Sequence, residues 1–217
     1  MPHYSRDGET ASIMALAPVI PVLTVMSVED GLEQAKALVA GGLYAIEVTL
    51  RTPSALAAIR AISKSLPDAV AGAGTIVAVE QIDEAIAAGA RFLVSPGATP
   101  ALAKAAAQSP VPFLPGCATA SEAMTLRELG FRALKLFPAE AVGGARLLAS
   151  LAAPLPDLSF CPTGGIDFAK APDYLKLPNV ACVGGSWMLP KAALTAGDYA
   201  VVETLAREAA RLARVPA

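Results

Sequence analysis

Two charged residues stand inside short apolar segments of the kind that form buried strands. Lys135 lies in ALKLF (residues 133–137), and Glu47 lies in AIEVT (residues 45–49). Lysine and glutamate are almost never fully buried unless they are paired, so each needs a partner or a function. A structural ion pair is one interpretation. The other is catalysis, because a desolvated lysine has a lowered pKa and attacks carbonyl carbons, while a carboxylate moves protons.

Two glycine-containing turns follow the last two apolar segments of the chain. They are Thr163-Gly164-Gly165 and Gly184-Gly185-Ser186. Backbone N–H groups in such turns form phosphate sites in α/β proteins. One pair of glycines would indicate only a tight turn, but two pairs in these places favour phosphate. Arg51 offers a guanidinium group for a carboxylate or a phosphate. Alternatively, it is a solvated charge at the start of a helix.

A repeated alternation of short apolar segments and alanine-rich amphipathic segments must position these residues. This pattern is typical of βα units and a parallel sheet. Eight strands are expected, which predicts an α/β fold, a single-domain (β/α)8 TIM barrel. They are Val19–Thr24, Tyr44–Thr49, Ala69–Gly74, Phe92–Ser95, Val111–Leu114, Arg132–Phe137, Leu158–Cys161 and Val180–Val183. An open doubly wound sheet explains the same alternation, but it usually binds ligand through a glycine-rich turn after an early strand.

Helix signals and the chain ends complete this outline. Capping boxes are predicted at Ser27-x-x-Asp30 and Thr119-x-x-Glu122, and Thr52-Pro53 predicts an N-cap with proline in the first turn. A last helix is expected from about Asp198 to Arg214. Residues 1–12 are expected to be a disordered tail, and residues 13–217 to form the domain.

Composition excludes several classes of protein. The chain has 217 residues, with 17 basic against 19 acidic side chains and 54% hydrophobic residues. We therefore expect a globular protein with no nucleic-acid partner. No apolar run reaches the roughly 18 residues of a membrane span, so we expect no membrane partner and a cytoplasmic location. His3 is the only histidine, and Cys117, Cys161 and Cys182 lack metal-ligand spacing, so we predict no metal site and buried thiols.

In a parallel barrel, functional residues gather at the C-terminal ends of the strands. Residues placed there include Thr24, Thr75, Pro96 and Phe137. Glu47 is the best acid or base available, because no usable histidine is present. Phe137 is equally compatible with ordinary core packing.

Six motifs in order resemble those of the 2-keto-3-deoxy-6-phosphogluconate aldolases, which are class I aldolases of the Entner–Doudoroff pathway. They are EVTLRT at 47–52, GAGT at 72–75, SPG at 95–97, KLFPAE at 135–140, FCPTGG at 160–165 and GGSW at 184–187. The resemblance covers roughly residues 16 to 210. It implies a (β/α)8 barrel that assembles as a homotrimer and uses no metal or organic cofactor.

The resemblance also implies roles for the residues singled out above. Lys135 forms the imine and Glu47 shuttles protons. The pyruvate end is lined by Arg51, Thr75, Pro96 and Phe137, with Thr163 beside the substrate chain. The phosphate is held by Gly164, Gly165, Gly185 and Ser186.

The expected reaction is reversible cleavage of 2-keto-3-deoxy-6-phosphogluconate to pyruvate and glyceraldehyde 3-phosphate. Relatives that act on the galactonate epimer often carry arginine after the leucine of the first strand, whereas Thr24 follows Leu23 here and favours the gluconate substrate. The alternatives are that epimer and 4-hydroxy-2-oxoglutarate. Outside this class stand a sugar-phosphate isomerase or synthase and a non-catalytic barrel that binds a phosphorylated metabolite.

Overall fold

Parallel strands in two sheets form the centre of the protein. In the computed structural model, which describes residues 7–213, the larger sheet has the order β5-β4-β3-β2-β1-β9 and the smaller has the order β6-β7-β8. The strands are β1 (Val19–Leu23), β2 (Ala45–Thr49), β3 (Val70–Gly74), β4 (Phe92–Val94), β5 (Phe113–Leu114), β6 (Gly116–Cys117), β7 (Ala133–Leu136), β8 (Ser159–Pro162) and β9 (Val183–Gly185). The predicted parallel α/β alternation is confirmed.

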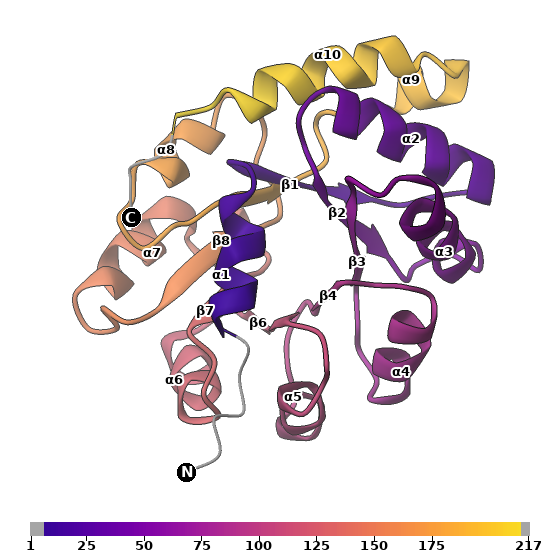
Figure 1. The fold of residues 1–217 in the computed structure, drawn as a ribbon. Coiled ribbons are helices and arrows are strands. Elements are labelled where there is room, and N and C mark those ends of the chain that lie inside the picture. The colour runs from indigo at the N-terminus through magenta and orange to yellow at the C-terminus, as the bar shows by residue number, and fades with distance from the viewer. Residues whose placement is uncertain (1–6, 214–217) are drawn as a thin grey trace.

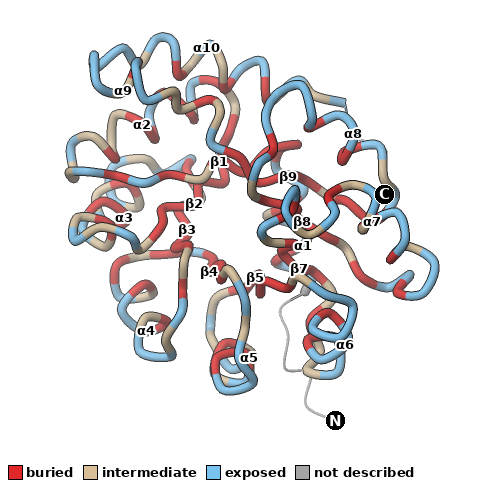
Figure 2. Tube along the Cα trace, turned by 180° about the vertical axis from the view of Figure 1, so that it is seen from behind, coloured by how far each residue is buried: buried red, intermediate tan, exposed pale blue. Residues whose placement is uncertain are grey.

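Most helices lie around the outside of the curved strands, whereas α1 lies over the strands at the centre of the view (Figure 1). They are α1 (Asp7–Ala15), α2 (Val28–Ala40), α3 (Ala55–Ser65), α4 (Glu80–Ala87), α5 (Pro100–Ala107), α6 (Ala120–Glu128), the 3-10 helix η1 (Glu140–Val142), α7 (Gly144–Ala152), α8 (Ala171–Leu175), α9 (Lys191–Ala196) and α10 (Tyr199–Ala210). Buried residues follow the strands and the inner sides of the helices (Figure 2). Within residues 7–213, no helix has the length and apolar character needed to cross a bilayer.

The two sheets approach each other at two places. Pro115 alone separates β5 from β6, and proline lacks the N–H that a continuous ladder needs. On the other side, isolated parallel bridges pair Phe160 with Val180 and Thr163 with Gly184, next to β8 and β9. The fifth expected strand, Val111–Leu114, is shortened to β5, and β6 after Pro115 was not expected. The last strand begins at Val183, three residues later than expected.

Helix α1 corrects the predicted tail. It covers residues 7–15 and places Met14 in a buried cluster with side chains from the strands, so the assignment of residues 7–12 to a disordered tail is wrong. Residues 1–6, including His3, lie outside the described part of the chain. The cluster comprises Met14, Ile20, Ala45, Phe92, Val94, Leu114, Ala133, Cys161 and Cys182. Contacts with distant strands fix α1, and its own sequence shows no helical pattern that predicts them.

Two of the three predicted helix starts are confirmed. The Ser27 hydroxyl accepts a hydrogen bond from the Asp30 N–H, and Thr119 forms a complete capping box with Glu122. The N-cap predicted at Thr52 is wrong, because α3 begins at Ala55. The Thr52 hydroxyl instead donates to the Val25 carbonyl at 2.7 Å, which ties the loop after β2 to the loop after β1. The last helix ends at Ala210, and Arg214 lies outside the described residues.

The three cysteines are buried free thiols, as predicted. Cys161 and Cys182 belong to the cluster beside Met14. Burial, reinforced by the Glu122 carboxylate, raises the pKa of the Cys117 thiol to about 12. That thiol therefore stays protonated at neutral pH and packs as a small apolar group.

Gln34 in α2 is a buried polar residue whose side chain lacks hydrogen-bond partners within the described residues. Its side chain is fully buried, and neither amide atom has a hydrogen-bond partner within the described residues. Replacing Gln34 by methionine, which has a similar shape, is expected to raise the free energy of unfolding by about 1–3 kcal/mol. Urea unfolding of the two proteins measures this difference.

Gln81 provides the matched control for that experiment. Its carbonyl accepts hydrogen bonds from the N–H groups of Val77 and Ala78 at 2.8 and 3.1 Å. The same change to methionine there is expected to lower stability, because two backbone donors lose their acceptor. A destabilising Gln34→Met would contradict the interpretation of Gln34 as an unsatisfied group.

Candidate active site

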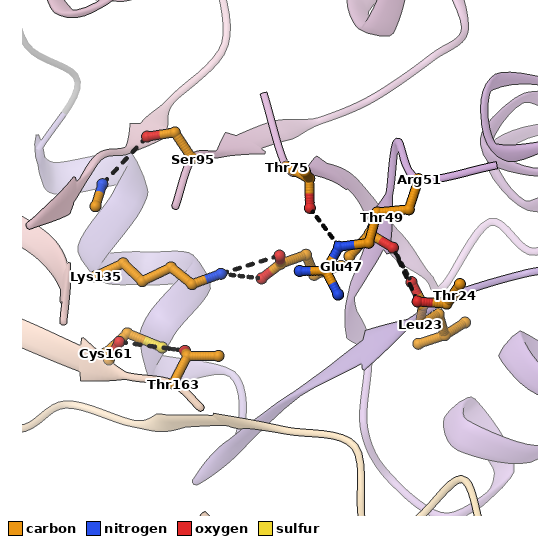
Figure 3. Close-up of polar contacts among 11 residues, drawn as sticks. Leu23, Thr24, Glu47, Thr49, Arg51, Thr75, Ser95, Lys135, Cys161 and Thr163 are labelled. Atoms are coloured by element: carbon orange, nitrogen blue, oxygen red, sulfur yellow. Dashed lines mark hydrogen bonds and ion pairs between the residues drawn. The ribbon is translucent and has the colours of Figure 1, made fainter. Parts of the chain in front are cut away.

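Lys135 and Glu47 form a buried ion pair between the two sheets (Figure 3). The Lys135 Nζ lies 3.1 Å from Glu47 Oε1 and 3.4 Å from Oε2. Lys135 comes from β7 and Glu47 from β2, and their relative exposures are 4% and 3%. The Lys135 Nζ also lies 5.4 Å from the centroid of the Phe137 ring, within the range of a cation–π contact. An amine and a carboxylate removed from water can exchange a proton directly at this distance.

Gly74 on β3 makes room for the Glu47 carboxylate. A Cβ atom on Gly74 would lie 2.1 Å from Glu47 Oε1, so any side chain at residue 74 would displace the carboxylate. In the ladder between β2 and β3, Glu47 is paired with Gly72 and Thr49 with Gly74, so Gly74 lies two residues beyond the partner of Glu47, on the same face of the sheet. Gly74 of the GAGT segment therefore leaves the space that the Glu47 carboxylate occupies.

Arg51 and Thr75 meet at the rim above this pair. The Arg51 Nε donates to the Thr75 hydroxyl at 3.1 Å (Figure 3). Thr75 has a φ of 62°, a left-handed conformation that is unfavourable for a β-branched residue. Such backbone strain is typical of ligand-binding positions, where the surrounding structure maintains it. Arg51 is exposed, so its guanidinium is accessible to an anion.

A cavity of about 140 Å³ opens beside Arg51 at the C-terminal ends of the strands. It brings together seven of the residues predicted for the site. They are Arg51, Phe137, Thr163, Gly164, Gly165, Gly185 and Ser186. Val22, Ile166 and Gly184 complete its lining. Lys135, Glu47, Thr75 and Pro96 do not line this cavity, although Thr75 contacts it through Arg51.

Pro96 has a different environment. A Cβ on Gly116 would lie 2.3 Å from the Pro96 carbonyl carbon, so Pro96 packs against the start of β6. The neighbouring Ser95 hydroxyl accepts a hydrogen bond from the Gly116 N–H at 3.1 Å. This contact joins the end of β4 to β6 across the position of Pro115.

The glycines of the two predicted phosphate turns are held in close contact. Gly164 and Gly165 have φ values of 106° and 79°, which other residues rarely adopt. A Cβ on Gly184 would lie 2.2 Å from Thr163 Oγ1, and a Cβ on Gly185 would lie 1.9 Å from the Trp187 ring. The turns therefore need glycine at these positions, and residues of both turns line the cavity.

Sequence reasoning missed several polar residues that support the site. Thr49 donates to the Leu23 carbonyl at 2.7 Å and contacts the Thr24 hydroxyl at 3.2 Å, which joins the ends of β1 and β2. Glu140, Lys170 and Tyr174 form a second network beneath the Gly164-Gly165 turn. Glu140 stands in the KLFPAE motif, which was a signal for it. No pattern in the sequence connects it to Lys170.

A larger hollow of about 460 Å³ lies at the other end of the strands. It is lined by residues of α1, by Leu16 directly after it, and by residues that precede β4 and β5, including Arg91 and Val111. None of the predicted site residues lines it. The larger hollow is therefore not the one at which the predicted glycine turns and Arg51 meet, at the C-terminal ends of the strands.

Known proteins share this sequence and arrangement over nearly the whole chain. Residues 10–205 match the family model described as KDPG and KHG aldolase, where KDPG is 2-keto-3-deoxy-6-phosphogluconate. The KHG/KDPG aldolase of Escherichia coli K12 is 48% identical over 215 residues, which cover 99% of this chain and 100% of that protein. These matches confirm the resemblance drawn from the six motifs.

Two solved structures are similar as well. The Zymomonas mobilis ZM4 enzyme, a 2-keto-3-deoxy-6-phosphogluconate aldolase with 3-phosphoglycerate, has a TM-score of 0.92 and 45% identity, covering 96% of this chain and 98% of that one. The Legionella pneumophila KDPG aldolase was captured at low pH with pyruvate as a covalent carbinolamine. It has a TM-score of 0.90 and 42% identity, covering 92% of this chain and 97% of that one.

Proposed function

The chain belongs to the KDPG and KHG aldolase family, and on that premise we propose that it cleaves 2-keto-3-deoxy-6-phosphogluconate to pyruvate and glyceraldehyde 3-phosphate through a Schiff base on Lys135. The observation that carries this proposal is the buried Lys135–Glu47 pair, 3.1 Å apart. The pair supplies a nucleophile and a base together. The carbinolamine of the Legionella relative is the first covalent intermediate of the same chemistry.

Imine formation begins at Lys135. Only the unprotonated amine attacks the C2 ketone, and Glu47 is the base within hydrogen-bond distance of Nζ that can accept the ammonium proton. Attack gives a carbinolamine. Glu47 then returns its proton to the departing hydroxyl group, so that loss of water gives an iminium ion and Glu47 is again a carboxylate. The positive nitrogen then accepts the electron pair of the C3–C4 bond, so the reaction needs no cofactor.

Bond cleavage requires removal of the C4 hydroxyl proton. Glu47 takes this proton, directly or through one water, as the C3–C4 bond breaks and glyceraldehyde 3-phosphate leaves. The remaining enamine is protonated at C3, and hydrolysis of the imine releases pyruvate and restores Lys135. The same carboxylate thus serves as base and then as acid.

The residues at the rim position the two ends of the substrate. Arg51 and Thr75 bind the pyruvate carboxylate, beside Pro96 and Phe137, and Thr163 contacts the chain of the substrate. Gly164, Gly165, Gly185 and Ser186 hold the phosphate. Support comes from the shared cavity of Arg51, Thr163 and the two glycine turns and from the phosphorylated ligand 3-phosphoglycerate in the Zymomonas relative.

The scaffold proposed for this reaction is a closed (β/α)8 barrel, in one domain that includes α1. The bridges at Phe160 and Thr163 and the single proline between β5 and β6 support closure. We also propose a homotrimer in the cytoplasm. Met26 and Val77, 76% and 59% exposed on rim loops, supply apolar surface for such an assembly, which light scattering would test.

Cleavage of 4-hydroxy-2-oxoglutarate is a second candidate activity. The family description includes KHG aldolases, and the E. coli relative carries both names. That substrate has no phosphate, so it would use the Lys135 end of the site without the glycine turns. Thr24 after Leu23 favours the gluconate over the galactonate epimer of the phosphorylated substrate.

A lactate dehydrogenase-coupled assay of pyruvate release tests the proposed function. We expect turnover of 2-keto-3-deoxy-6-phosphogluconate that a chelator leaves unchanged. The galactonate epimer and 4-hydroxy-2-oxoglutarate should react more slowly. An isomerase or a binding protein would bind a phosphorylated ligand yet release no pyruvate, and that result would refute the proposal.

A further inference from the structure

A lysine outside the predicted site is tied to the first glycine turn. The Lys170 Nζ donates to the Gly165 carbonyl at 3.0 Å and forms an ion pair with Glu140 at 2.9 Å. Lys170 precedes the short helix α8, which lies beside α7 (Figure 1). Tyr174, one turn into α8, donates its hydroxyl hydrogen to the same Glu140 carboxylate. Glu140 thus fixes the ammonium group next to the turn.

These contacts determine which way the peptide groups of the turn face. The Gly164 carbonyl accepts from the Glu140 N–H at 3.1 Å, and the Gly165 carbonyl accepts from Lys170. In a trans peptide the C=O and the N–H point in opposite directions. The N–H groups of Gly165 and Ile166 therefore face away from Glu140 and Lys170, toward the cavity that both residues line.

Those two amides have no acceptor within residues 7–213, since no described backbone or side-chain oxygen receives them. Successive free N–H groups form an anion-binding concavity. A carbonyl that turned toward the cavity would present a partial negative charge to an anion. Phosphate binding therefore depends on holding the Gly165 carbonyl away from the cavity as well as on presenting the Ile166 N–H to it.

Charge acts in the same direction. Lys170 and Glu140 cancel as a pair, so the carboxylate beside the turn does not repel a phosphate while the ammonium is present. The hydrogen bond from Tyr174, with that from Lys170, lowers the pKa of Glu140. Glu140 is therefore an anion at neutral pH. Loss of the lysine would leave its negative charge unpaired beside the turn that carries the N–H groups of Gly165 and Ile166.

We propose that Lys170 is a positioning residue for the substrate phosphate, which holds the Gly165 carbonyl away from the cavity and neutralises Glu140. This inference rests on the function proposed above. It adds a residue that does not line the cavity, and it predicts that Lys170 distinguishes phosphorylated from unphosphorylated substrates.

The test compares Lys170→Met, Lys170→Gln and Lys176→Met on two substrates at fixed ionic strength. Lys176 is the matched control, because it lies at the other end of α8, and its partner Asp173, 2.7 Å away, is exposed. For Lys170→Met, we expect KM for 2-keto-3-deoxy-6-phosphogluconate to rise roughly fivefold to tenfold. We expect kcat with 4-hydroxy-2-oxoglutarate, and its KM, to stay within about twofold of the wild type. Lys170→Gln keeps a donor for the Gly165 carbonyl without the charge. Its KM for 2-keto-3-deoxy-6-phosphogluconate should lie between those of the wild type and Lys170→Met.

A binding measurement separates this inference from the proposed function. Calorimetric titration with 3-phosphoglycerate needs no turnover, and its Kd should rise for Lys170→Met and not for Lys176→Met. An unchanged Kd and KM in Lys170→Met, or an equal loss with both substrates, would overturn the role of Lys170. Wild type that binds 3-phosphoglycerate but releases no pyruvate would refute only the proposed function.

Discussion

Replacing Lys135 by methionine is expected to abolish pyruvate release, by at least about 10⁴-fold, because its amine forms the iminium in the proposed reaction. Borohydride added with pyruvate should reduce the imine to a stable adduct on Lys135 of the wild type. Peptide mapping by mass spectrometry locates that adduct. It should be absent from Lys135→Met and present in Lys36→Met, which removes an exposed lysine of α2.

Stability needs its own control in this experiment. Lys135→Met leaves the Glu47 carboxylate buried without its partner, which costs about 3–5 kcal/mol in comparable buried pairs. The double variant Lys135→Met with Glu47→Gln removes both charges and should recover most of that loss. A folded double variant without activity would therefore attribute the defect to chemistry. An adduct on a different lysine would refute the assignment of Lys135.

Glu47→Gln is expected to separate imine formation from proton transfer. The amide keeps the shape of the carboxylate against Gly74, so the fold and the space around Lys135 should persist. It cannot accept a proton, so exchange of the pyruvate methyl hydrogens for deuterium should fall by roughly 10²–10⁴-fold. Proton NMR follows this exchange, and borohydride with pyruvate should still trap some adduct.

The same substitution at Glu122 provides the comparison. Glu122 caps α6 with Thr119 on the surface, and its change to glutamine preserves the capping box. Glu122→Gln should exchange the pyruvate methyl hydrogens at the rate of the wild type. Exchange in Glu47→Gln at the wild-type rate would remove Glu47 from its role.

The parallel α/β fold and the contact between the key residues were predictable for physical reasons. A lone lysine and a lone glutamate in apolar strands had to meet, because neither charge is stable alone in a core. They do meet, at 3.1 Å. The late glycine turns were predictable as well, since parallel strands place their C-terminal ends at one rim. Residues of both turns line one cavity together with Arg51. The catalytic roles of these residues stay predictions.

The remaining features depend on contacts that no local pattern encodes. Helix α1 is held by Met14 among side chains from several strands, and its segment alone resembled a polar tail. Thr52 matched an N-cap signal, yet its hydroxyl bonds to the loop after β1. Lys170 resembled an ordinary surface charge until the fold placed Gly165 and Glu140 within its reach.

The position of the Lys135–Glu47 pair between β7 and β2 has a mechanical consequence. These strands belong to different sheets, so the ion pair is also an electrostatic tie across the centre of the protein. An iminium nitrogen keeps the positive charge, and the tie survives in that state. A carbinolamine with a neutral nitrogen loses it. In the proposed reaction, the charge on the Lys135 side of this join therefore changes with the covalent state of one nitrogen atom.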